Sequence, residues 1–293
     1  MGQYYRFINI DKKQKCDRNQ GMLKLMEHSY LDDEYCDDIL SLISNEWKGD
    51  RILHVGDYAE GGDGTTTSEL IHRIEKENNL NKSVYDWGEK FKEIEPRSVD
   101  SKIRYIYNLN RKEYIDLEKQ PIQRCFYEND KIYFSKFNIF ALLIACGNEQ
   151  GGGDYFGINR RKIGLWAGDR FVSSASLLKE YSNFKEQKYI FNECLQLNNR
   201  IKNINEKSER QILNAEGIVL KKFLNWYKDY CKMDFSKIKI DKGRLTDVEF
   251  KYLNSILKKY KKRELYKQKN LDNKIEKEEN KSTKNSSIDE VIL

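Results

Sequence analysis

The sequence has no closely spaced cysteines, only three histidines and no long run of apolar residues. Its six cysteines include no Cys-x-x-Cys pair, which excludes the spacing of a zinc ribbon and indicates reduced thiols in an intracellular protein. The longest apolar run, Phe140–Cys146, has the length of a strand and is too short to cross a membrane. The first eleven residues mix charged and aromatic side chains and lack the apolar region of a signal peptide. We therefore expect a cytoplasmic protein that does not associate with a membrane.

Hydrophobic residues are also scarce, at 39% of the chain, whereas charged residues reach 34%. The hydrophobic share is lower, and the charged share higher, than in an ordinary globular protein. The 13 Phe and 19 Tyr partly offset the shortage of aliphatic residues. A folded core is therefore expected, with a polar segment elsewhere that lowers the average.

Positive charge is concentrated in the C-terminal third. Residues 200–293 hold 24 Lys and Arg against 15 Asp and Glu, whereas residues 1–199 hold 29 against 32. Such an asymmetry is typical of a protein whose basic part contacts an anionic partner. A solvated helical face would give the same counts, so both interpretations remain open.

A repeated Trp-x-Gly-Asp-Arg motif marks an internal duplication. The motif stands at Trp47–Arg51 and again at Trp166–Arg170, and two apolar residues follow each copy. Upstream, residues 7–13 and 106–112 share a short apolar run, an Asn, a final Lys and an Asp four residues further on. Each of these segments is typical of a strand that runs into a polar turn. The agreement in order and spacing predicts two copies of one structural unit.

The predicted fold class is α/β (α+β), with two similar duplicated units followed by a helical C-terminal region. The two units occupy residues 1–100 and 101–185 and are expected to pack against each other. A helical, basic region follows at 186–275, and a polar, disordered tail at 276–293.

Residue spacing predicts several individual elements. In the first unit we expect a helix over 35–44, a strand over 51–55 and, after a glycine-rich loop, a helix over 68–77. In the second unit, residues 139–146 form an apolar strand or the end of a helix. Further on, residues 176–204 have mixed helical spacing.

The last predicted helix begins at a recognisable cap. Thr246 and Glu249 have the spacing of a capping box, in which each residue satisfies a backbone N–H group of the other. Apolar residues at helical spacing follow, and their stripe becomes sparse after Lys261.

Five segments together carry a family resemblance. They are Met1–Tyr5, Leu23–Ser29, Gly56–Glu60, Gly151–Asp154 and Trp166–Arg170. In this combination the chain resembles a widespread family of bacterial and phage hypothetical proteins that begin Met-Gly-Gln-Tyr-Tyr or Met-Gly-Gln-Tyr-Trp. The resemblance covers residues 1–175 and implies no activity, and the helical region lies outside the family's pattern.

A glycine-rich loop is a candidate ligand site. The candidate ligand-binding residues are Gly151, Gly152, Gly153, Asp154, Arg160 and Arg161. Consecutive glycines allow backbone N–H groups to close around an anion, and the arginines could meet a phosphate. The loop matches neither the Walker pattern nor the dinucleotide-binding pattern. A plain irregular connection is the other interpretation.

The Asp-Arg pairs of the two motifs also admit two interpretations. Asp50, Arg51, Asp169 and Arg170 could brace tight turns after Gly and bridge between the repeats. Alternatively, the two carboxylates could form a paired site for acid–base chemistry or a metal. With Trp47 and Trp166, we assign both motifs a structural role and keep the site as the alternative.

His28 and His54 are the remaining candidates for chemistry. With Glu27 and Asp57 they would form an acid–base or metal cluster if the fold brought them together. No Ser or Cys lies in a recognisable nucleophile motif. These histidines and the two motif aspartates are therefore the alternative catalytic residues, and neither a cofactor nor a metal is predicted.

A cluster of basic and aromatic residues is the candidate contact for nucleic acid or another partner. Its members are Lys258, Lys259, Tyr260, Lys261, Lys262, Arg263 and Tyr266. Basic side chains suit the phosphate backbone, and aromatic side chains suit stacking on bases. An ordinary amphipathic helix, whose lysine stems cover a packed stripe, is the other interpretation.

We expect a non-enzymatic binding protein of phage or mobile-element origin that contacts nucleic acid or a ribonucleoprotein. An anti-CRISPR-like inhibition of a host defence nuclease is the biological role that this combination favours. The alternative is a small-molecule or nucleotide-handling enzyme that uses the glycine-rich loop and the Asp-Arg motifs. The sequence does not predict the oligomeric state.

Overall fold

The computed structural model describes most of the chain and divides it into two compact units. The first unit contains residues 1–124 and 134–212, and the second contains residues 125–133 and 213–293. The described residues are 3–17, 24–25, 28, 34–59, 67–100, 102–120, 122–147, 163–187, 217–218, 220–225 and 237–289.

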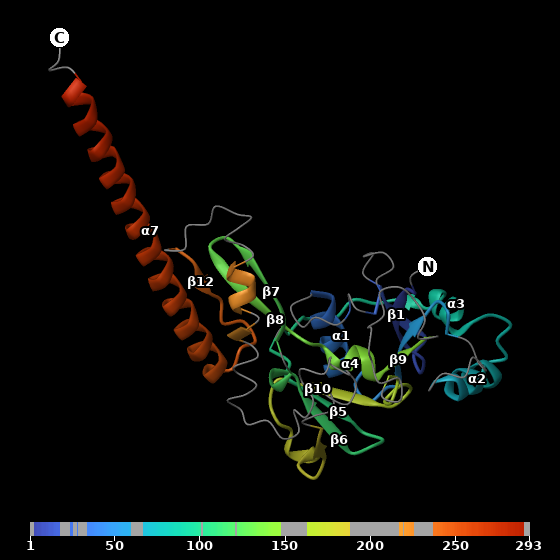
Figure 1. Ribbon diagram of the computed structural model, residues 1–293. Helices are drawn as coiled ribbons and strands as arrows, with labels where there is room; N and C mark the ends of the chain where they lie inside the picture. Colours follow the sequence, from blue (N-terminus) through green and yellow to red (C-terminus); the bar gives the residue numbers. More distant parts are fainter. Residues whose placement is uncertain are drawn as a thin grey trace. The chain divides into compact units, whose positions relative to one another are not determined.

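The first unit consists of two sheets with short helices against them (Figure 1). Its strands are β1 (Tyr5–Asn9), β2 (Gln14–Cys16), β3 (Ile52–Gly56), β4 (Lys92–Glu93), β5 (Tyr105–Asn108), β6 (Glu113–Asp116), β9 (Ala145–Cys146), β10 (Phe171–Ser174) and β11 (Lys185–Glu186). Its helices are α1 (Glu34–Ser44), α2 (Ser68–Glu77), α3 (Val84–Glu89) and α4 (Ile139–Leu143), with 3-10 turns η2 (Leu117–Lys119) and η3 (Lys179–Tyr181).

The two sheets repeat one topology, which confirms the predicted duplication. Their strand orders are β4-β2-β1-β3-β9 and β11-β6-β5-β10. In each sheet the strand after the Trp-x-Gly-Asp-Arg motif pairs antiparallel with a hairpin, and a two-residue strand pairs parallel with its other side. The registers also agree: Phe7 lies opposite Cys16 and His54 in the first sheet, as Ile106 lies opposite Ile115 and Ser173 in the second.

The hairpin turns are built from the same residue types in both repeats. Lys13 and Lys112 adopt positive φ angles of 51° and 54°. Before each turn an Asn side chain accepts a backbone N–H three residues on: Asn9 Oδ1 from Lys12 at 3.0 Å, and Asn108 Oδ1 from Arg111 at 3.0 Å. A short polar side chain that caps a turn in this way fixes where the strand ends.

The two repeats share one hydrophobic core. α1 of the first repeat lies against β10 of the second, where Ser173 Oγ donates to Leu40 O at 2.5 Å. In the other direction, the N–H of His54 in β3 donates to Ile144 O, just after α4, at 3.0 Å. Trp47 and Trp166 are both fully buried in the resulting cluster. Each repeat therefore covers the other, as predicted for packed duplicated units.

Most of the predicted elements are confirmed, whereas the segment after β10 differs from its prediction. α1, β3 and α2 lie where the spacing predicts them. Residues 139–146 combine both predicted possibilities, because α4 ends before β9 begins. The helix expected from residue 176 onward is wrong over 176–187, which form η3 and β11. There the Tyr181 ring contacts Tyr107 of the sheet at a tilt and the Phe184 ring contacts it edge-on, a role that helical spacing alone does not reveal.

The second unit is organised around a three-stranded sheet and a long helix. It contains β12 (Lys239–Ile240), α7 (Asp247–Asp289) and helical residues at 217–218 and 220–225. The hairpin of β7 (Ile122–Glu128) and β8 (Lys131–Lys136) belongs to it over residues 125–133 and to the first unit at both ends. The strand order is β12-β8-β7, and β12 runs parallel to β8. The predicted capping box is present at the start of α7: Glu249 N–H donates to Thr246 Oγ1 at 3.2 Å, and Thr246 N–H donates to Glu249 Oε2 at 2.7 Å.

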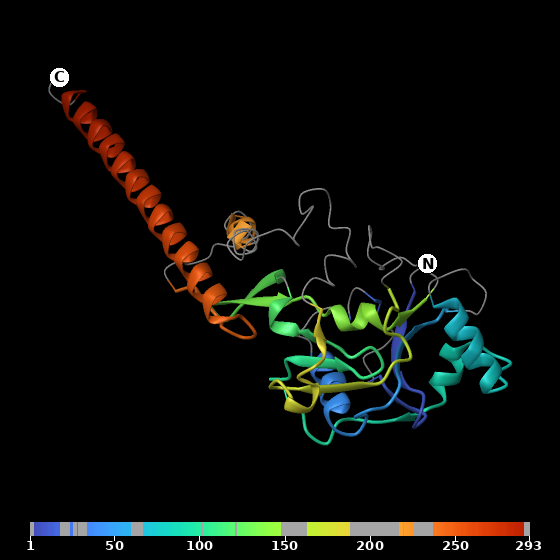
Figure 2. The same cartoon turned by 90° about the horizontal axis from the view of Figure 1, so that it is seen from below.

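α7 continues to Asp289 as one uninterrupted helix (Figures 1 and 2), whereas the sequence predicted a disordered tail over 276–293. Lysine and glutamate dominate residues 274–281, and both are strong helix formers that lose little rotamer freedom in a helix. The prediction of disorder rested on polarity, which does not distinguish a solvated helix from a disordered chain.

Candidate functional site

The two Trp-x-Gly-Asp-Arg motifs form matching tight turns. Gly49 and Gly168 have φ angles of +77° and +73°, the left-handed region that favours glycine. The indole N–H of Trp47 donates to Gln14 Oε1 at 2.8 Å, and that of Trp166 donates to Glu113 Oε2 at 3.2 Å. Each motif is therefore anchored to the second strand of its own hairpin.

The aspartates of the motifs are engaged in bracing contacts. Asp50 Oδ2 accepts from Asn9 Nδ2 at 2.7 Å and pairs with Lys12 Nζ at 2.7 Å. Asp169 Oδ2 accepts from Asn108 Nδ2 at 2.8 Å and from the Nε of Arg111 at 2.9 Å. Each carboxylate thus joins the motif to the hairpin turn of the same repeat. This geometry favours the structural interpretation over a paired catalytic site.

The arginines of the motifs meet where the two repeats join. Arg51 and Arg170 form an antiparallel bridge, and both guanidinium groups contact the Asp11 carboxylate at 2.8 Å. Burial raises the pKa of Asp11, but hydrogen bonds from Arg51 and the charges of both arginines outweigh this and leave it lowered. Gly49 N–H donates to Phe171 O at 2.7 Å alongside. The arginines therefore connect the repeats.

His28 and His54 come together, but in the core. Their ring centroids lie 4.6 Å apart, and the His54 ring stacks on Phe7 at 4.1 Å. His28 Nε2 lies 3.4 Å from Tyr5 O, and His54 Nδ1 lies 3.1 Å from Ala141 O. Burial lowers the pKa of His28 to about 4 and that of His54 well below its usual value. Both rings are therefore neutral at pH 7.

The rest of the predicted histidine cluster does not assemble among the described residues. Asp57 is engaged elsewhere, since its Oδ1 accepts from Tyr4 N–H at 3.0 Å. Glu27 lies outside the described residues. Within the described part of the chain, no group of three or more His, Cys, Asp or Glu could hold a metal ion.

The glycine-rich loop begins directly after β9. The candidate ligand residues there, Gly151, Gly152, Gly153, Asp154, Arg160 and Arg161, lie outside the described residues. β9 itself pairs parallel with β3 at the edge of the first sheet. Among the described residues the second sheet has four strands, so β9 has no counterpart there.

The basic helix predicted near the C-terminus is the first half of α7. Its packed side is apolar: Leu253, Ile256, Leu257 and Tyr260 are all buried. The Tyr260 hydroxyl donates to Oδ1 of Asn225, in the helical residues 220–225, at 3.0 Å. The stripe and its partners fix which side of α7 faces solvent.

The structure divides the predicted contact residues into two groups. Tyr260 is 9% exposed, and the Lys261 ammonium donates to Ile238 O at 2.6 Å, so both belong to the packed side. The rest of the predicted cluster is exposed, as are Lys251, Lys267 and Lys269 outside it. Without Lys267, which pairs with Glu264, the exposed residues are Lys251, Lys258, Lys259, Lys262, Arg263, Tyr266 and Lys269.

These seven residues form what we call the basic face of α7. Tyr266 is 67% exposed, and helix periodicity places Lys262, Arg263 and Lys269 within one turn of it. Between Phe250 and Asn270 the single acidic residue is Glu264.

Glu264 does not neutralise the basic face. Its side chain is 12% exposed and pairs with Lys267 at 3.0 Å. Among the described residues, the basic-face cations from Lys258 to Lys269 have no ion-pair partner. Their positive charge is therefore available to an external anion.

The sequence analysis missed Lys251 and Lys269 because it considered only one contiguous run of residues. Residues spaced by three, four and seven positions share one side of a helix, so a helix face extends beyond such a run. The apolar stripe was visible in the sequence, and placing the lysines opposite it would have found the correct set.

Comparison of the chain with protein-family models, curated proteins and solved structures finds no match. The resemblance to the Met-Gly-Gln-Tyr-Tyr family therefore stays a prediction. Among the described residues, no helix combines the length and the apolar character needed to cross a membrane.

Proposed function

We propose that this chain is a non-enzymatic binding protein whose basic face on α7 contacts nucleic acid, free or within a ribonucleoprotein. The observation that carries the proposal is a helix side with exposed, unneutralised cations around an exposed tyrosine. Cations at helical spacing can follow a phosphate backbone, and a solvent-exposed aromatic ring can stack on an unpaired base. This combination favours single-stranded over duplex nucleic acid.

The first experiment measures the binding of single-stranded RNA and DNA to the full chain at several salt concentrations. If the six cations of the basic face contact phosphates, log Kd should change with log salt with a slope of up to about 4. Lys259→Glu, Lys262→Glu and Arg263→Glu together should remove binding, because they reverse the charge on the centre of the face. A chain that binds neither strand at low salt contradicts the proposal.

A matched control separates the basic face from net charge. Lys76, Lys82 and Lys90 are exposed lysines near α2 and α3 of the first unit. Changing these three to Glu alters the net charge equally and should leave most of the affinity in place. An equal loss in both triple variants would mean that attraction is general and that α7 is not the contact surface.

Tyr266 tests the stacking part of the proposal. Tyr266→Ala should weaken single-strand binding by about fivefold or more, since stacking on one base contributes about 1–3 kcal/mol. Tyr266→Phe retains the ring and should bind as the unchanged chain does. Equal affinities for all three proteins would exclude stacking.

The finer proposal is that the bound nucleic acid belongs to a host defence nuclease, in an anti-CRISPR-like role. It is tested by adding the chain, with and without residues 246–293, to a guide-RNA effector nuclease and following target cleavage. Inhibition that requires residues 246–293 supports this role. Unchanged cleavage with both proteins excludes the inhibitory role for that effector. The nucleic-acid proposal does not depend on this outcome, because it is tested separately by the binding experiments above.

A further inference from the structure

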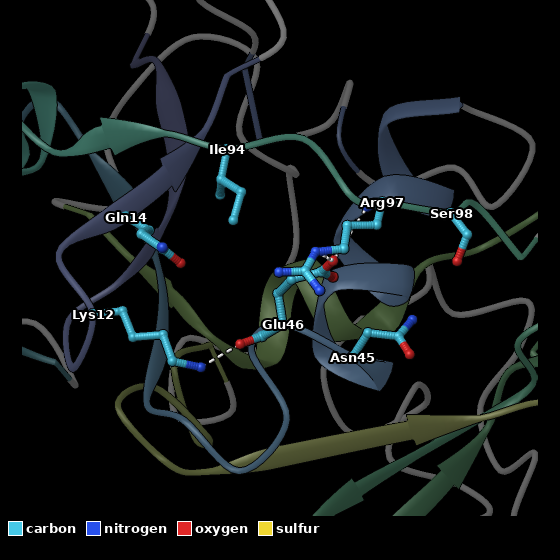
Figure 3. A pocket seen from close by; sticks show the side chains of 7 residues that line it. All are labelled: Lys12, Gln14, Asn45, Glu46, Ile94, Arg97 and Ser98. Carbon is cyan, nitrogen blue, oxygen red and sulfur yellow. Dashed lines mark hydrogen bonds and ion pairs between the residues drawn. The ribbon is translucent and has the colours of Figure 1, made fainter.

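A polar pocket of about 500 Å³ lies beside the Trp47 motif of the first repeat (Figure 3). It is lined by Lys12, Gln14, Asn45, Glu46, Ile94, Arg97 and Ser98. Ile94 is the one aliphatic member of this lining. The nucleic-acid proposal makes no use of this pocket, which belongs to the other unit of the chain.

Glu46 is the chemically unusual member of the lining. Its side chain is 12% exposed, and its Oε1 accepts from the backbone N–H of Arg97 at 3.2 Å. Its Oε2 is buried and has no hydrogen-bond partner among the described residues. A buried carboxylate oxygen without a donor is unfavourable and uncommon in folded proteins. The carboxylate therefore has the capacity to accept a donor from a ligand.

The Arg97 side chain lies next to the Glu46 carboxylate but contacts it only loosely. Its Nε lies 3.5 Å from Glu46 Oε1, and in Figure 3 the guanidinium lies beside the carboxylate. The Arg97 side chain is 91% exposed, so water screens the pair and the guanidinium can turn outward. The backbone N–H of Arg97 would keep Glu46 in place during that movement.

Donors for an anionic group lie on the other side of the pocket. Lys12 Nζ pairs with Asp50 at 2.7 Å and donates to Glu46 O, which leaves one of its three protons. Gln14 Oε1 is occupied by the Trp47 indole, so the amide Nε2 is left as a donor. The pocket thus combines one negatively charged hydrogen-bond acceptor, the Glu46 carboxylate, with several hydrogen-bond donors.

We propose that this pocket binds a small zwitterion of the α-amino-acid type. The ligand ammonium replaces the Arg97 guanidinium and donates to Glu46 Oε2. The ligand carboxylate accepts from Lys12 and from the displaced Arg97. Because the Glu46 and Asp50 charges balance those of Lys12 and Arg97, a zwitterion fits better than a phosphate dianion. The mainly polar lining favours a polar ligand side chain.

Different residues stand at the equivalent place in the second repeat. Gln187 there occupies the position of Ile94, and its Nε2 donates to Glu113 Oε1 at 2.6 Å. Leu165 precedes Trp166 where Glu46 precedes Trp47. The acceptor is therefore absent, and the residue equivalent to Gln14 is already bonded. The difference between matched repeats indicates that the first has a ligand-binding role of its own.

The test is isothermal titration calorimetry of the full chain with polar α-amino acids, one at a time at millimolar concentration. At least one should bind with saturable heat. Its N-acetyl derivative lacks the ammonium and its decarboxylated amine lacks the carboxylate, so both should bind at least tenfold more weakly. Failure of every amino acid to bind would overturn the proposal.

Variants then assign the contacts. Glu46→Gln keeps the shape of the side chain and should weaken amino-acid binding at least tenfold. Arg97→Ala should also weaken binding of the amino acid but not of the amine. Glu77→Gln, at an exposed ion pair on α2, is the matched control and should bind normally. Equal affinities for Glu46→Gln and the unchanged chain would overturn the proposal even if binding occurs.

Discussion

His28 and His54 make the stability of the fold depend on pH. The pKa values of both histidines in the folded chain lie below the usual value of about 6.5, because burial disfavours the charged rings. That of His28 is lowered to about 4, and that of His54 is also well below its usual value. The unfolded chain therefore binds more protons between these values. Stability is fully present above about pH 6.5 and is lost as the pH falls towards 4.

We expect the free energy of unfolding to fall by about 2 kcal/mol for His28 alone between pH 7 and pH 5, with a further loss from His54. Urea unfolding at the two pH values measures this change. His28→Gln cannot titrate and should reduce the pH dependence, whereas His72→Gln, at an exposed position on α2, should not. A free energy that is independent of pH in this range would contradict the burial of both rings.

At the residue scale, the sequence revealed partners where the duplication repeated them and at the capping box of α7. Asn9 and Asn108 stand at matching positions, as do the motif aspartates, and the structure joins each Asn to its Asp. The histidine pair and Glu46 have no counterpart of the same residue type in the second repeat. Their neighbours come from segments far apart in the chain, so no spacing in the sequence indicates the contact.

At the scale of elements, the described buried side chains of α7 gather at the beginning of the helix. The buried side chains that the structure describes on this helix lie between Glu249 and Tyr260. Further along, Leu265 and Ile275 are 55% and 46% exposed. A helix without tertiary packing is marginal in water, because its own hydrogen bonds and propensity barely offset its loss of chain entropy.

Amide hydrogen exchange should therefore show a gradient along α7. We expect strong protection over residues 253–260 and weak protection over residues 276–289, measured by mass spectrometry of peptides from the full chain. α1, which is buried in the core, provides an internal reference for a packed helix. Equal protection along the whole of α7 would mean that its second half packs against a partner, such as another copy of the chain.

Long elements with a regular pattern were predictable, and short strands were not. Apolar spacing predicts α1, α2 and β3, and the residue types at its start predict the cap of α7. β4, β9, β11 and β12 have two residues each. A strand of that length exists only because a neighbouring strand offers hydrogen bonds, and this information is tertiary.

At the scale of the first unit, the pseudo-symmetric junction should make the two repeats unfold together. Backbone hydrogen bonds cross it in both directions, from Gly49 to Phe171 O at 2.7 Å and from Gly168 to Ile52 O at 3.2 Å. The largest core cluster also contains side chains of both repeats. Separating the repeats would expose this shared apolar surface, whose burial contributes much of the stability.

Trp47 and Trp166 are matched reporters of this cooperativity, since each is fully buried at the same position of its repeat. In the chain labelled with 5-fluorotryptophan, both native fluorine signals should disappear at the same urea concentration. Trp→Phe variants at the two positions assign the signals. Two separate midpoints would show that each repeat is stable alone, and the shared core would then contribute less than its burial indicates. A common midpoint would show that the duplicated halves have become one folding unit, in which a residue such as Glu46 can change in one repeat while the other maintains the fold.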